Sequence, residues 1–408
     1  MATASKPRAE PTDHYINKIY LYRHNFILLI WFPGQQIGSD MPHRSIKGRG
    51  QQQADSKREF SIMLYHRVSV SAPSRFHLTL ADLNGSFSDR VDGGVGFALS
   101  SPRFEITATQ ATGRNAITCD IDDPEDRVEA ENAIEAALGA LHQKLRLPEV
   151  DIFVKSPVSS HAGLGSKTAL LLGIAKAYTT LYGYEFPGRE LARFVGRGGT
   201  SGIGSNCFDQ GGFVVDCGHR AEVKAGAFMT SGWATDIPPG PLLARYDMPD
   251  WPMLLVTPIA RKIHGALEQQ LFAQVCPIPM EDVRAVSHIT MMMLIPAVIE
   301  DDPKIFARGI NELQKCRWKS HQIECQAEVV PVVMEKLREM GVSGVAMSSW
   351  GSSILAMGPE MDDPAFRTGI VAAIQQVMND YDGGTVSEIR CDNVGHKLRT
   401  FRVPALQA

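Results

Sequence analysis

The chain has 408 residues, of which 44% are hydrophobic and 21% are charged, so it is long enough for two or three domains with cores of their own. A net charge of −4 and an isoelectric point near 6.3 give no bulk attraction to nucleic acid or to a membrane surface. The seven cysteines are scattered without a Cys-x-x-Cys pair, which favours a reducing compartment over a disulfide framework and argues against zinc. We expect a cytoplasmic protein with small-molecule partners.

Residues 1–66 differ from the rest of the chain. They are polar and irregular, and the stretch at 48–59 has the composition of a disordered segment. The apolar run at 26–32 is far shorter than the ~20 residues of a membrane helix. This region is an extension with a role of its own, a short docking segment, or translated upstream sequence with the working start near Met63. We favour the third, because strand-like patterning begins just after Met63.

The stretch that begins at Arg67 alternates apolar and polar residues, which predicts a strand. A glycine turn at 92–94 and two further short strands follow. Residues 123–145 predict a helix with an acidic first turn, as the helix dipole prefers. The candidate inward-facing residues of the first strand are Val68, Val70, Phe76, Leu78 and Leu80.

A strand predicted at 151–155 leads through a small-residue loop into a helix at 167–182. Gly163 and Gly165 lie just before the helix, whose free N–H groups and dipole favour an anion. The alternative is that the loop is a structural turn between strand and helix and binds no ligand. The loop is not a Walker A motif, because Ser166 separates the last glycine from Lys167.

A second glycine-dense segment occupies residues 196–205, between a helix at 190–195 and a strand at 213–216. Arg193 and Arg197 flank it, so it is either a mobile linker or a second wall of an anion pocket. Residues 220–249 indicate a domain boundary. Beyond it we expect strands at 253–258 and 385–391, a pair of strands joined by a Ser/Gly turn at 342–358, and helices at 264–275, 281–299, 303–318, 326–340 and 363–380. The expected ranges are therefore an extension at 1–66 and domains at 67–245 and 246–408.

The pattern Pro157-x5-Gly163-Leu164-Gly165-Ser166 resembles the phosphate loop of the GHMP kinase superfamily. Together with the segments at 74–85, 90–96 and 197–219, in that order and spacing, it resembles the β-ribofuranosylaminobenzene 5′-phosphate synthase family. The resemblance covers roughly residues 67 to 400. It implies an α+β, GHMP-kinase-like two-domain fold, with the glycine-rich phosphate loop between a strand and a helix.

The resemblance also implies a reaction. Members condense 4-aminobenzoate, or in some relatives 4-hydroxybenzoate, with phosphoribosyl pyrophosphate, and release CO2 and pyrophosphate on the way to tetrahydromethanopterin. It implies Mg2+ as cofactor and a homodimer. An ATP-dependent GHMP-type kinase and a non-catalytic phosphate-ligand-binding protein are the alternatives. Against the kinase, Gly204 stands where mevalonate-kinase-like members carry an Asp, although Asp209 is a possible substitute.

The implied reaction assigns roles to residues of the matching segments, each of which also has a purely structural alternative. The pyrophosphate binds at the loop, the ribose 5-phosphate at the second glycine segment, and the aromatic acid near Trp350 and Asn84. The candidates are Gly163, Leu164, Gly165, Ser166 and Lys167 for pyrophosphate, Arg197, Gly202 and Gly204 for the 5-phosphate, Asp82 and Asp92 for Mg2+, Arg75 or His77 for the acid's carboxylate, and His161 and His264 for protons.

Overall fold

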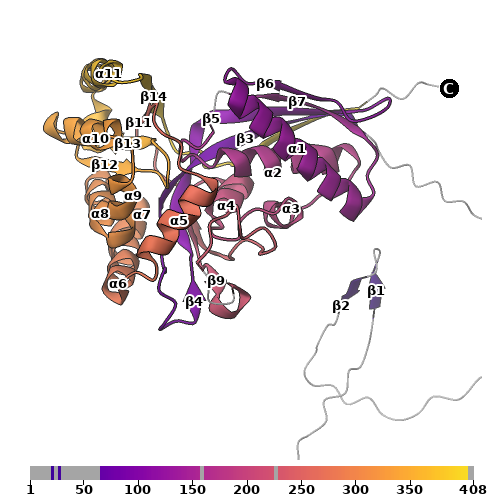
Figure 1. Cartoon of the computed structure of the whole chain (residues 1–408), viewed down its shortest axis with the longest axis horizontal. Helices are drawn as coiled ribbons and strands as arrows, with labels where there is room; N and C mark the ends of the chain where they lie inside the picture. Colours follow the sequence, from indigo (N-terminus) through magenta and orange to yellow (C-terminus); the bar gives the residue numbers. More distant parts are fainter. Residues whose placement is uncertain (1–19, 23–25, 29–64, 157–159, 225–227, 403–408) are drawn as a thin grey trace, which may run out of the picture. The chain divides into compact units, whose positions relative to one another are not determined.

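The computed structural model describes residues 20–22, 26–28, 65–156, 160–224 and 228–402. The chain forms two compact units, Met1–Phe60 and Ser61–Ala408. In the first, strands β1 (Tyr20–Tyr22) and β2 (Phe26–Leu28) pair antiparallel. The expected disorder at 48–59 and the start near Met63 lie outside the described residues. Figure 1 shows the elements of the second unit, to which the rest of the description refers.

The first sheet of the second unit has seven strands. Its path runs β10-β8-β5-β3-β15, with β7 on β5 and β6 on β7. Neighbours are antiparallel except β6 and β7, which are parallel. The last strand, from the expected range 246–408, pairs with the first strand of the range 67–245. The strands are β3 (Tyr65–Thr79), β5 (Gly94–Gln110), β6 (Ile117–Asp120), β7 (Val150–Lys155), β8 (Phe213–Asp216), β10 (Leu242–Tyr246) and β15 (Lys397–Arg402); the short strands β4 (Arg90–Val91) and β9 (His219–Arg220) pair separately.

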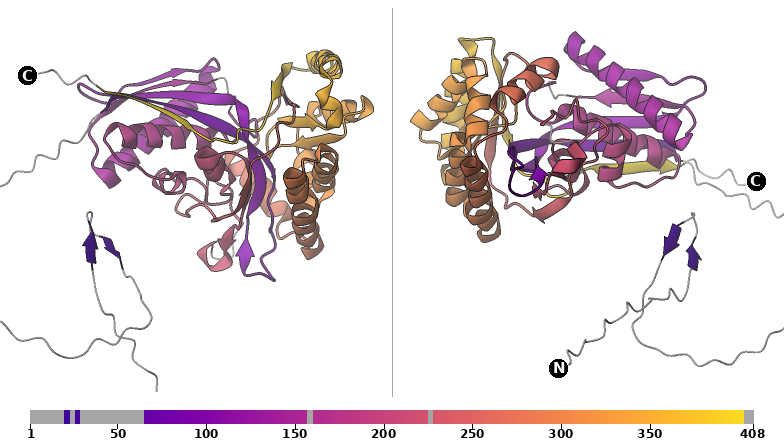
Figure 2. Two further views of the ribbon diagram at one scale, coloured as in Figure 1. Left: turned by 180° about the vertical axis from the view of Figure 1, so that it is seen from behind. Right: turned by 60° about the horizontal axis from the view of Figure 1, so that its bottom comes forward.

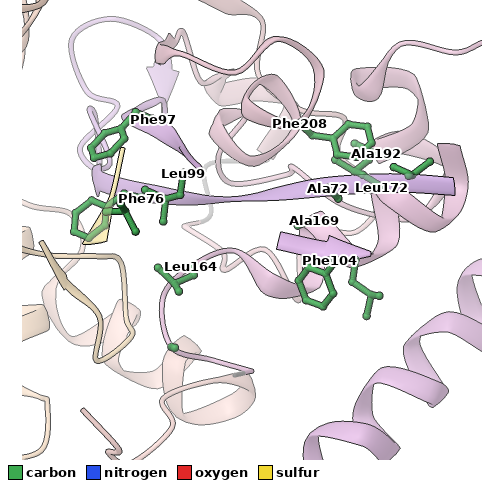
Figure 3. Close-up of a cluster of buried hydrophobic side chains, with 14 of the residues drawn as sticks. Ala72, Phe76, Phe97, Leu99, Phe104, Leu164, Ala169, Leu172, Ala192 and Phe208 are labelled. Carbon is green, nitrogen blue, oxygen red and sulfur yellow. The ribbon is translucent and has the colours of Figure 1, made fainter. Parts of the chain in front are cut away.

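Four helices cover one face of this sheet (Figures 1 and 2). They are α1 (Pro124–Leu145), α2 (Ser166–Leu181), α3 (Gly188–Phe194) and α4 (Ile203–Gln210). Side chains alternate between the faces of a strand, and the four predicted inward residues that lie in β3, Val68, Val70, Phe76 and Leu78, are buried. Leu80, just after the strand, is buried too. The outward side carries polar contacts such as the 3.2 Å bond between the Ser69 and Thr107 hydroxyls. Figure 3 shows part of the buried cluster, drawn from β3, β5, α2, α3, α4 and Leu164 of the loop.

The second sheet has the order β12-β13-β11-β14, all antiparallel. Its strands are β11 (Met253–Pro258), β12 (Gly344–Met347), β13 (Ile354–Met357) and β14 (Gly384–Ile389). Leu255 and Leu355 face α7 (Ile295–Glu300) and α8 (Pro303–Lys315), whereas Leu254 and Ile354 face α10 (Val329–Glu339) and α11 (Pro364–Asn379). Both faces are therefore covered over β11, β12 and β13, and this explains the continuous apolar runs of these three strands.

The remaining helical elements are α5 (Gly265–Val275), α6 (Met280–Ile289), the π-helical turn η2 (Thr290–Leu294), α9 (Arg317–Glu324), and two short 3-10 turns, η1 (Ala221–Lys224) and η3 (Pro359–Asp362). Among the described residues, one helical stretch, Met280–Glu300, is long and apolar enough to resemble a membrane span by length and composition. Its Val286, Leu294 and Val298 lie in the main hydrophobic core. A core helix passes the same test, so the stretch is weak evidence for a membrane segment.

Two helix predictions differ from the structure. Residues 203–210, the end of the glycine segment and the residues after it, for which no helix was predicted, form α4, because Ile203, Cys207 and Phe208 bury an apolar face beneath β3 and β5. The single helix expected at 303–318 is broken at Cys316, whose backbone is extended (ψ 144°). The break lets Trp318 join an aromatic cluster different from the core that α8 fills.

Candidate active site

The phosphate-loop candidate lies between β7 and α2, as the sequence predicts. Gly163 (φ +83°) and Gly165 (φ +72°) adopt left-handed backbone conformations that L side chains rarely take. Gly165 caps α2 without a side-chain hydrogen bond to the helix. The N-terminus of α2 therefore presents backbone donors and the positive end of its dipole beside the loop.

A turn between β12 and β13 supports the loop from behind. The Ser348 hydroxyl donates to the Gly163 carbonyl (2.7 Å), and the Ser353 N–H donates to the Ala162 carbonyl (3.1 Å). A Cβ on Gly163 would lie 2.2 Å from the Ser348 carbonyl oxygen, and one on Gly351 would lie 1.9 Å from the Ala162 backbone. Both glycines are thus required by the contact between loop and turn.

A cavity of about 390 Å³, here called the main cavity, opens at this loop. Arg75 of β3 donates to the Gly163 carbonyl. Arg197 donates to the Thr168 hydroxyl (3.3 Å) and to the Ser231 carbonyl (3.2 Å). Burial lowers the pKa of Arg75 to about 10 and also lowers that of Arg197, yet both remain cationic near neutral pH. With Lys167 they give the cavity three cations near the helix N-terminus.

Opposite these cations, Glu129 of α1 anchors a cluster of charged groups. Its carboxylate binds His161 Nε2 (2.8 Å) and lies 3.6 Å from the Lys167 ammonium. The hydrogen bond from His161 holds the pKa of Glu129 at about 2, so this carboxylate is ionised. His161 stacks on His264 (ring centroids 3.9 Å apart), and burial lowers the pKa of His264.

A second, narrow cavity of about 60 Å³ adjoins the main one. Arg75, Glu268 and Trp350 line both. Aromatic rings line its inner end: Trp318 meets Phe272 and Trp350 edge-on, with centroids 4.6 and 5.3 Å apart. This narrow cavity has the dimensions and lining of a partial aromatic-ring site.

His77 also lines the narrow cavity. Its Nε2 lies 3.1 Å from the Ser201 hydroxyl, which is 3.4 Å from the Asp216 carboxylate. Burial lowers the pKa of His77, so its ring is neutral at pH 7, and burial raises the pKa of Asp216 to about 6. Lys319, which is fully buried, donates to the Gln322 side chain and to the Met347 carbonyl, and burial lowers the pKa of Lys319 to about 7.

The structure brings together most of the predicted site residues. Leu164 instead turns into the hydrophobic core, and His77 lines the narrow cavity. The predicted residues that line the main cavity are Arg75, His161, Gly163, Gly165, Ser166, Lys167, Arg197, His264 and Trp350.

The two predicted metal ligands lie elsewhere. Asp92 is fully buried and binds His219 Nδ1 (2.8 Å) and Lys224 Nζ (2.9 Å), so its charge is already compensated. Asp82 accepts from the N–H groups of Asn84 and Gly85 and shapes a turn. Neither lines a cavity beside the loop, so the metal role predicted for them is not supported. Across the described ranges, no group of three or more His, Cys, Asp or Glu is arranged to hold a metal ion.

Four other candidates are also structural in this arrangement. Asn84 donates to the Ile278 carbonyl (2.6 Å) and does not reach the main cavity. The Gly202 N–H donates to Asp216 (3.0 Å), and Gly204 lies in α4 against Thr168, where a Cβ would be 2.9 Å away. Asp209 accepts from the Gly188 N–H at the start of α3, outside both cavities.

Comparison with known proteins identifies the family. The N-terminal domain of GHMP kinases matches residues 132–216. The curated β-ribofuranosylphenol 5′-phosphate synthase of Methanothermobacter thermautotrophicus is 36% identical over 75% of this chain and 92% of its own length. That of Methanocaldococcus jannaschii is 31% identical over 81% and 99%. This chain belongs to the β-ribofuranosylphenol 5′-phosphate synthase family. It is therefore an enzyme, and the family resemblance seen in the sequence is confirmed.

The fold prediction is confirmed as well. A homoserine kinase from Cytophaga hutchinsonii superposes with a TM-score of 0.55, at 16% identity, over 86% of the enzyme and 100% of the kinase. At that identity the likeness establishes the GHMP-kinase fold alone.

Sequence reasoning missed several residues of the enzyme's cavities. The sequence assigned no role to Glu129, which lies in a helix with several other acidic residues, or to Trp318. Glu268 and Phe272 lie in residues 261–272, a segment that matches the family pattern only loosely. The one sequence signal for Glu268 was an acid just inside a helix start, three residues after Gly265.

Proposed function

We propose that the enzyme condenses 4-hydroxybenzoate or 4-aminobenzoate with phosphoribosyl pyrophosphate, and releases pyrophosphate and CO2, to give a β-ribofuranosyl-arene 5′-phosphate. One observation carries the proposal: a glycine loop, a helix N-terminus and three cations open into a cavity that narrows between aromatic rings. A sugar diphosphate and an arene are the two ligand types that these walls suit. The names of the curated relatives favour the phenol, hence the hydroxy acid.

The main cavity supplies what departure of pyrophosphate needs. As the bond from ribose C1 to oxygen breaks, its electron pair stays on the diphosphate and positive charge builds on the sugar. The N-terminus of α2 with Arg75, Lys167 and Arg197 stabilises the negative charge that appears on the leaving group. Arg197 is also suited to bidentate binding of a phosphate.

A Mg2+ ion fits the same cavity. Glu129 and the Ser166 hydroxyl, at the start of α2, would hold it. Glu129 is ionised and, unlike the buried Asp92, has a side chain that is 37% exposed, so a metal could replace its contacts with His161 and Lys167. Mg2+ is commonly held by one or two carboxylates plus phosphate oxygens and water. Bound to the diphosphate, Mg2+ supplies charge neutralisation.

We further propose that the enzyme acts in the cytoplasm as a homodimer and serves tetrahydromethanopterin synthesis.

The aromatic acid binds with its ring toward Trp350, so that the carbon bearing the carboxylate meets ribose C1. Attack dearomatises the ring, and loss of CO2 returns the bonding pair and restores aromaticity. The ring itself accepts the electrons, so no separate electron-sink cofactor is required.

The test is release of labelled CO2 from carboxyl-labelled 4-hydroxybenzoate and 4-aminobenzoate. We expect release only when phosphoribosyl pyrophosphate and Mg2+ are both present, and no dependence on ATP. Absence of CO2 release combined with ATP consumption in the presence of a hydroxyl acceptor would refute the proposal in favour of a kinase.

A further inference from the structure

The inference concerns Glu268, on the first turn of α5, and rests on the proposed function. Its carboxyl lines both the main and the narrow cavity, where the two meet. A cavity of about 150 Å³ holds one benzene ring, so the narrow cavity of about 60 Å³ takes only part of an arene. An acceptor ring therefore straddles the junction, with its carboxylate-bearing carbon toward the sugar in the main cavity and its 4-hydroxyl on the side of the narrow cavity, whose wall also includes Glu268.

Glu268 is the one cavity carboxylate without a hydrogen-bond or ion-pair partner within the described part of the chain. The other carboxylate of the main cavity, Glu129, is bound by His161 and Lys167. In the narrow cavity, His77 shares its Nε2 with Ser201. Among these groups, Glu268 alone has both oxygens available to a ligand.

The charges around Glu268 suit a group that gains and loses a proton. Burial raises its pKa to about 7, and the nearby positive charges of Arg197, His161 and Arg75 partly oppose that rise. The other charged or titratable groups lining the main cavity are Lys167 of α2, Glu129 of α1 and His264 at the start of α5. A pKa close to the working pH is the condition under which a general base is most effective.

We propose that Glu268 is the proton carrier for the 4-hydroxyl of the aromatic acid, and that this enzyme is thereby built for a hydroxy rather than an amino acceptor. A phenol, with a pKa of about 10, must lose its proton for the oxygen to push an electron pair into the ring. A neutral aromatic amino group donates its lone pair into the ring more strongly than a neutral hydroxyl does, so it depends less on a base.

The step balances. As the ring carbon bonds to ribose C1, Glu268 takes the hydroxyl proton, the oxygen becomes a ring carbonyl, and pyrophosphate leaves with the former sugar–oxygen pair. When the carbon–carboxylate bond breaks, its pair rearomatises the ring and CO2 departs. Glu268 then returns the proton to the oxygen, so it ends as the carboxylate it was at the start.

The experiment compares the full-length wild type, Glu268→Gln and the control Glu281→Gln, an exposed carboxylate on α6. CO2 release from each labelled acid is followed from about pH 5 to about pH 9 with saturating phosphoribosyl pyrophosphate and Mg2+. In Glu268→Gln we expect kcat/KM for 4-hydroxybenzoate to fall about 100-fold or more, and that for 4-aminobenzoate to change less than about threefold. Glu281→Gln should match the wild type with both.

The pH dependence of kcat/KM adds a second measurement, one that would not change if Glu268 had only a structural role. In the wild type, kcat/KM for the hydroxy acid should rise with pH through about 7, as the carboxyl ionises, and this limb should vanish in Glu268→Gln. Both acids share the same sugar donor, so a limb seen only with the hydroxy acid cannot come from the donor's phosphates.

Equal losses with both acids, or a limb that survives in Glu268→Gln, would overturn the role of Glu268. A wild type that uses 4-aminobenzoate but not 4-hydroxybenzoate would overturn it too. A wild type that releases CO2 from neither acid would instead refute the proposed function itself.

Discussion

The carboxyl group of Glu268 lies where burial disfavours its ionised form, so its ionisation lowers the free energy of unfolding. For an acid whose pKa is raised on folding, the native state binds more protons than the unfolded state between the two pKa values. Stability is therefore highest below the unfolded value and falls as pH rises through the folded value. A rise from 4.5 to about 7 corresponds to at most about 3 kcal/mol of unfolding free energy.

Glu268→Gln removes this titration, so we expect the variant to be more stable than the wild type at alkaline pH. The difference in Tm between the two should be small near pH 5 and widen to several degrees near pH 8. Thermal unfolding of the ligand-free proteins across that pH range measures it. Parallel Tm curves would mean that the carboxyl is better solvated than its place in the cavity wall implies.

At the residue scale, the surroundings of a side chain could be predicted where they are set by neighbours in the chain. They could not be predicted where they are set by residues that only the fold brings close. The loop residues from Gly163 to Lys167 adjoin the helix start by chain connectivity, so their neighbourhood was predictable. Asp92 looked like a ligand because it sits in a glycine turn. Its partner Lys224 is 132 residues away in the chain, and nothing in the local pattern signals that pair.

At the scale of elements, the phosphate loop and the turn at 348–353 act as one unit. Ser348 and Gly351 of the turn contact the loop through backbone atoms or a short side chain, which leaves no room for adjustment. The position of the α2 N-terminus relative to the cavity depends on this contact. Sequence periodicity predicted most helices and strands, but α4 was missed because Gly204 and the glycines that precede the helix obscured its apolar face.

Gly351→Ala tests that contact with the smallest possible side chain. Its Cβ would lie 1.9 Å from the Ala162 backbone, so loop and turn must separate. We expect kcat/KM for CO2 release to fall at least about 100-fold, since misplacement by about 1 Å is that costly, and Tm to fall as well.

Gly139→Ala is the matched control for this prediction. It lies on an exposed part of α1, with nothing within 4 Å of the added Cβ. Replacing a helical glycine with alanine should raise stability by about 0.5–1 kcal/mol and leave activity unchanged. If Gly351→Ala behaves like this control, the loop does not depend on the turn.

At the scale of the whole molecule, the sheets explain why domain ranges are harder to predict than elements. The first sheet is built from residues 65–246 and is completed by β15 at 397–402. The pairing of β3 with β15 could not be predicted from composition, because the two strands are far apart in the chain. By its own sequence, β15 is only a short polar segment after the second domain. The division between Phe60 and Ser61, in contrast, follows a change in composition that the sequence displays.

A chain starting at Met63 tests the interpretation of the N-terminal region. Strand β3 begins at Tyr65, so this start keeps every strand of the first sheet. We expect kcat/KM within about twofold and Tm within about 2 °C of the full-length chain, because Met1–Phe60 forms a compact unit separate from the one that holds the first sheet. A large loss of either would show that residues 1–62 contribute to folding or catalysis.

The late pairing of β15 also bears on how the polypeptide is made. Until the ribosome releases the C-terminus, β3 has a bare edge of N–H and C=O groups along Tyr65–Ser71, where β15 will pair. Such edges recruit strands from neighbouring chains. Nascent or prematurely terminated polypeptides that lack the last dozen residues should therefore be prone to aggregate, and high-level expression should benefit from slow synthesis or chaperones.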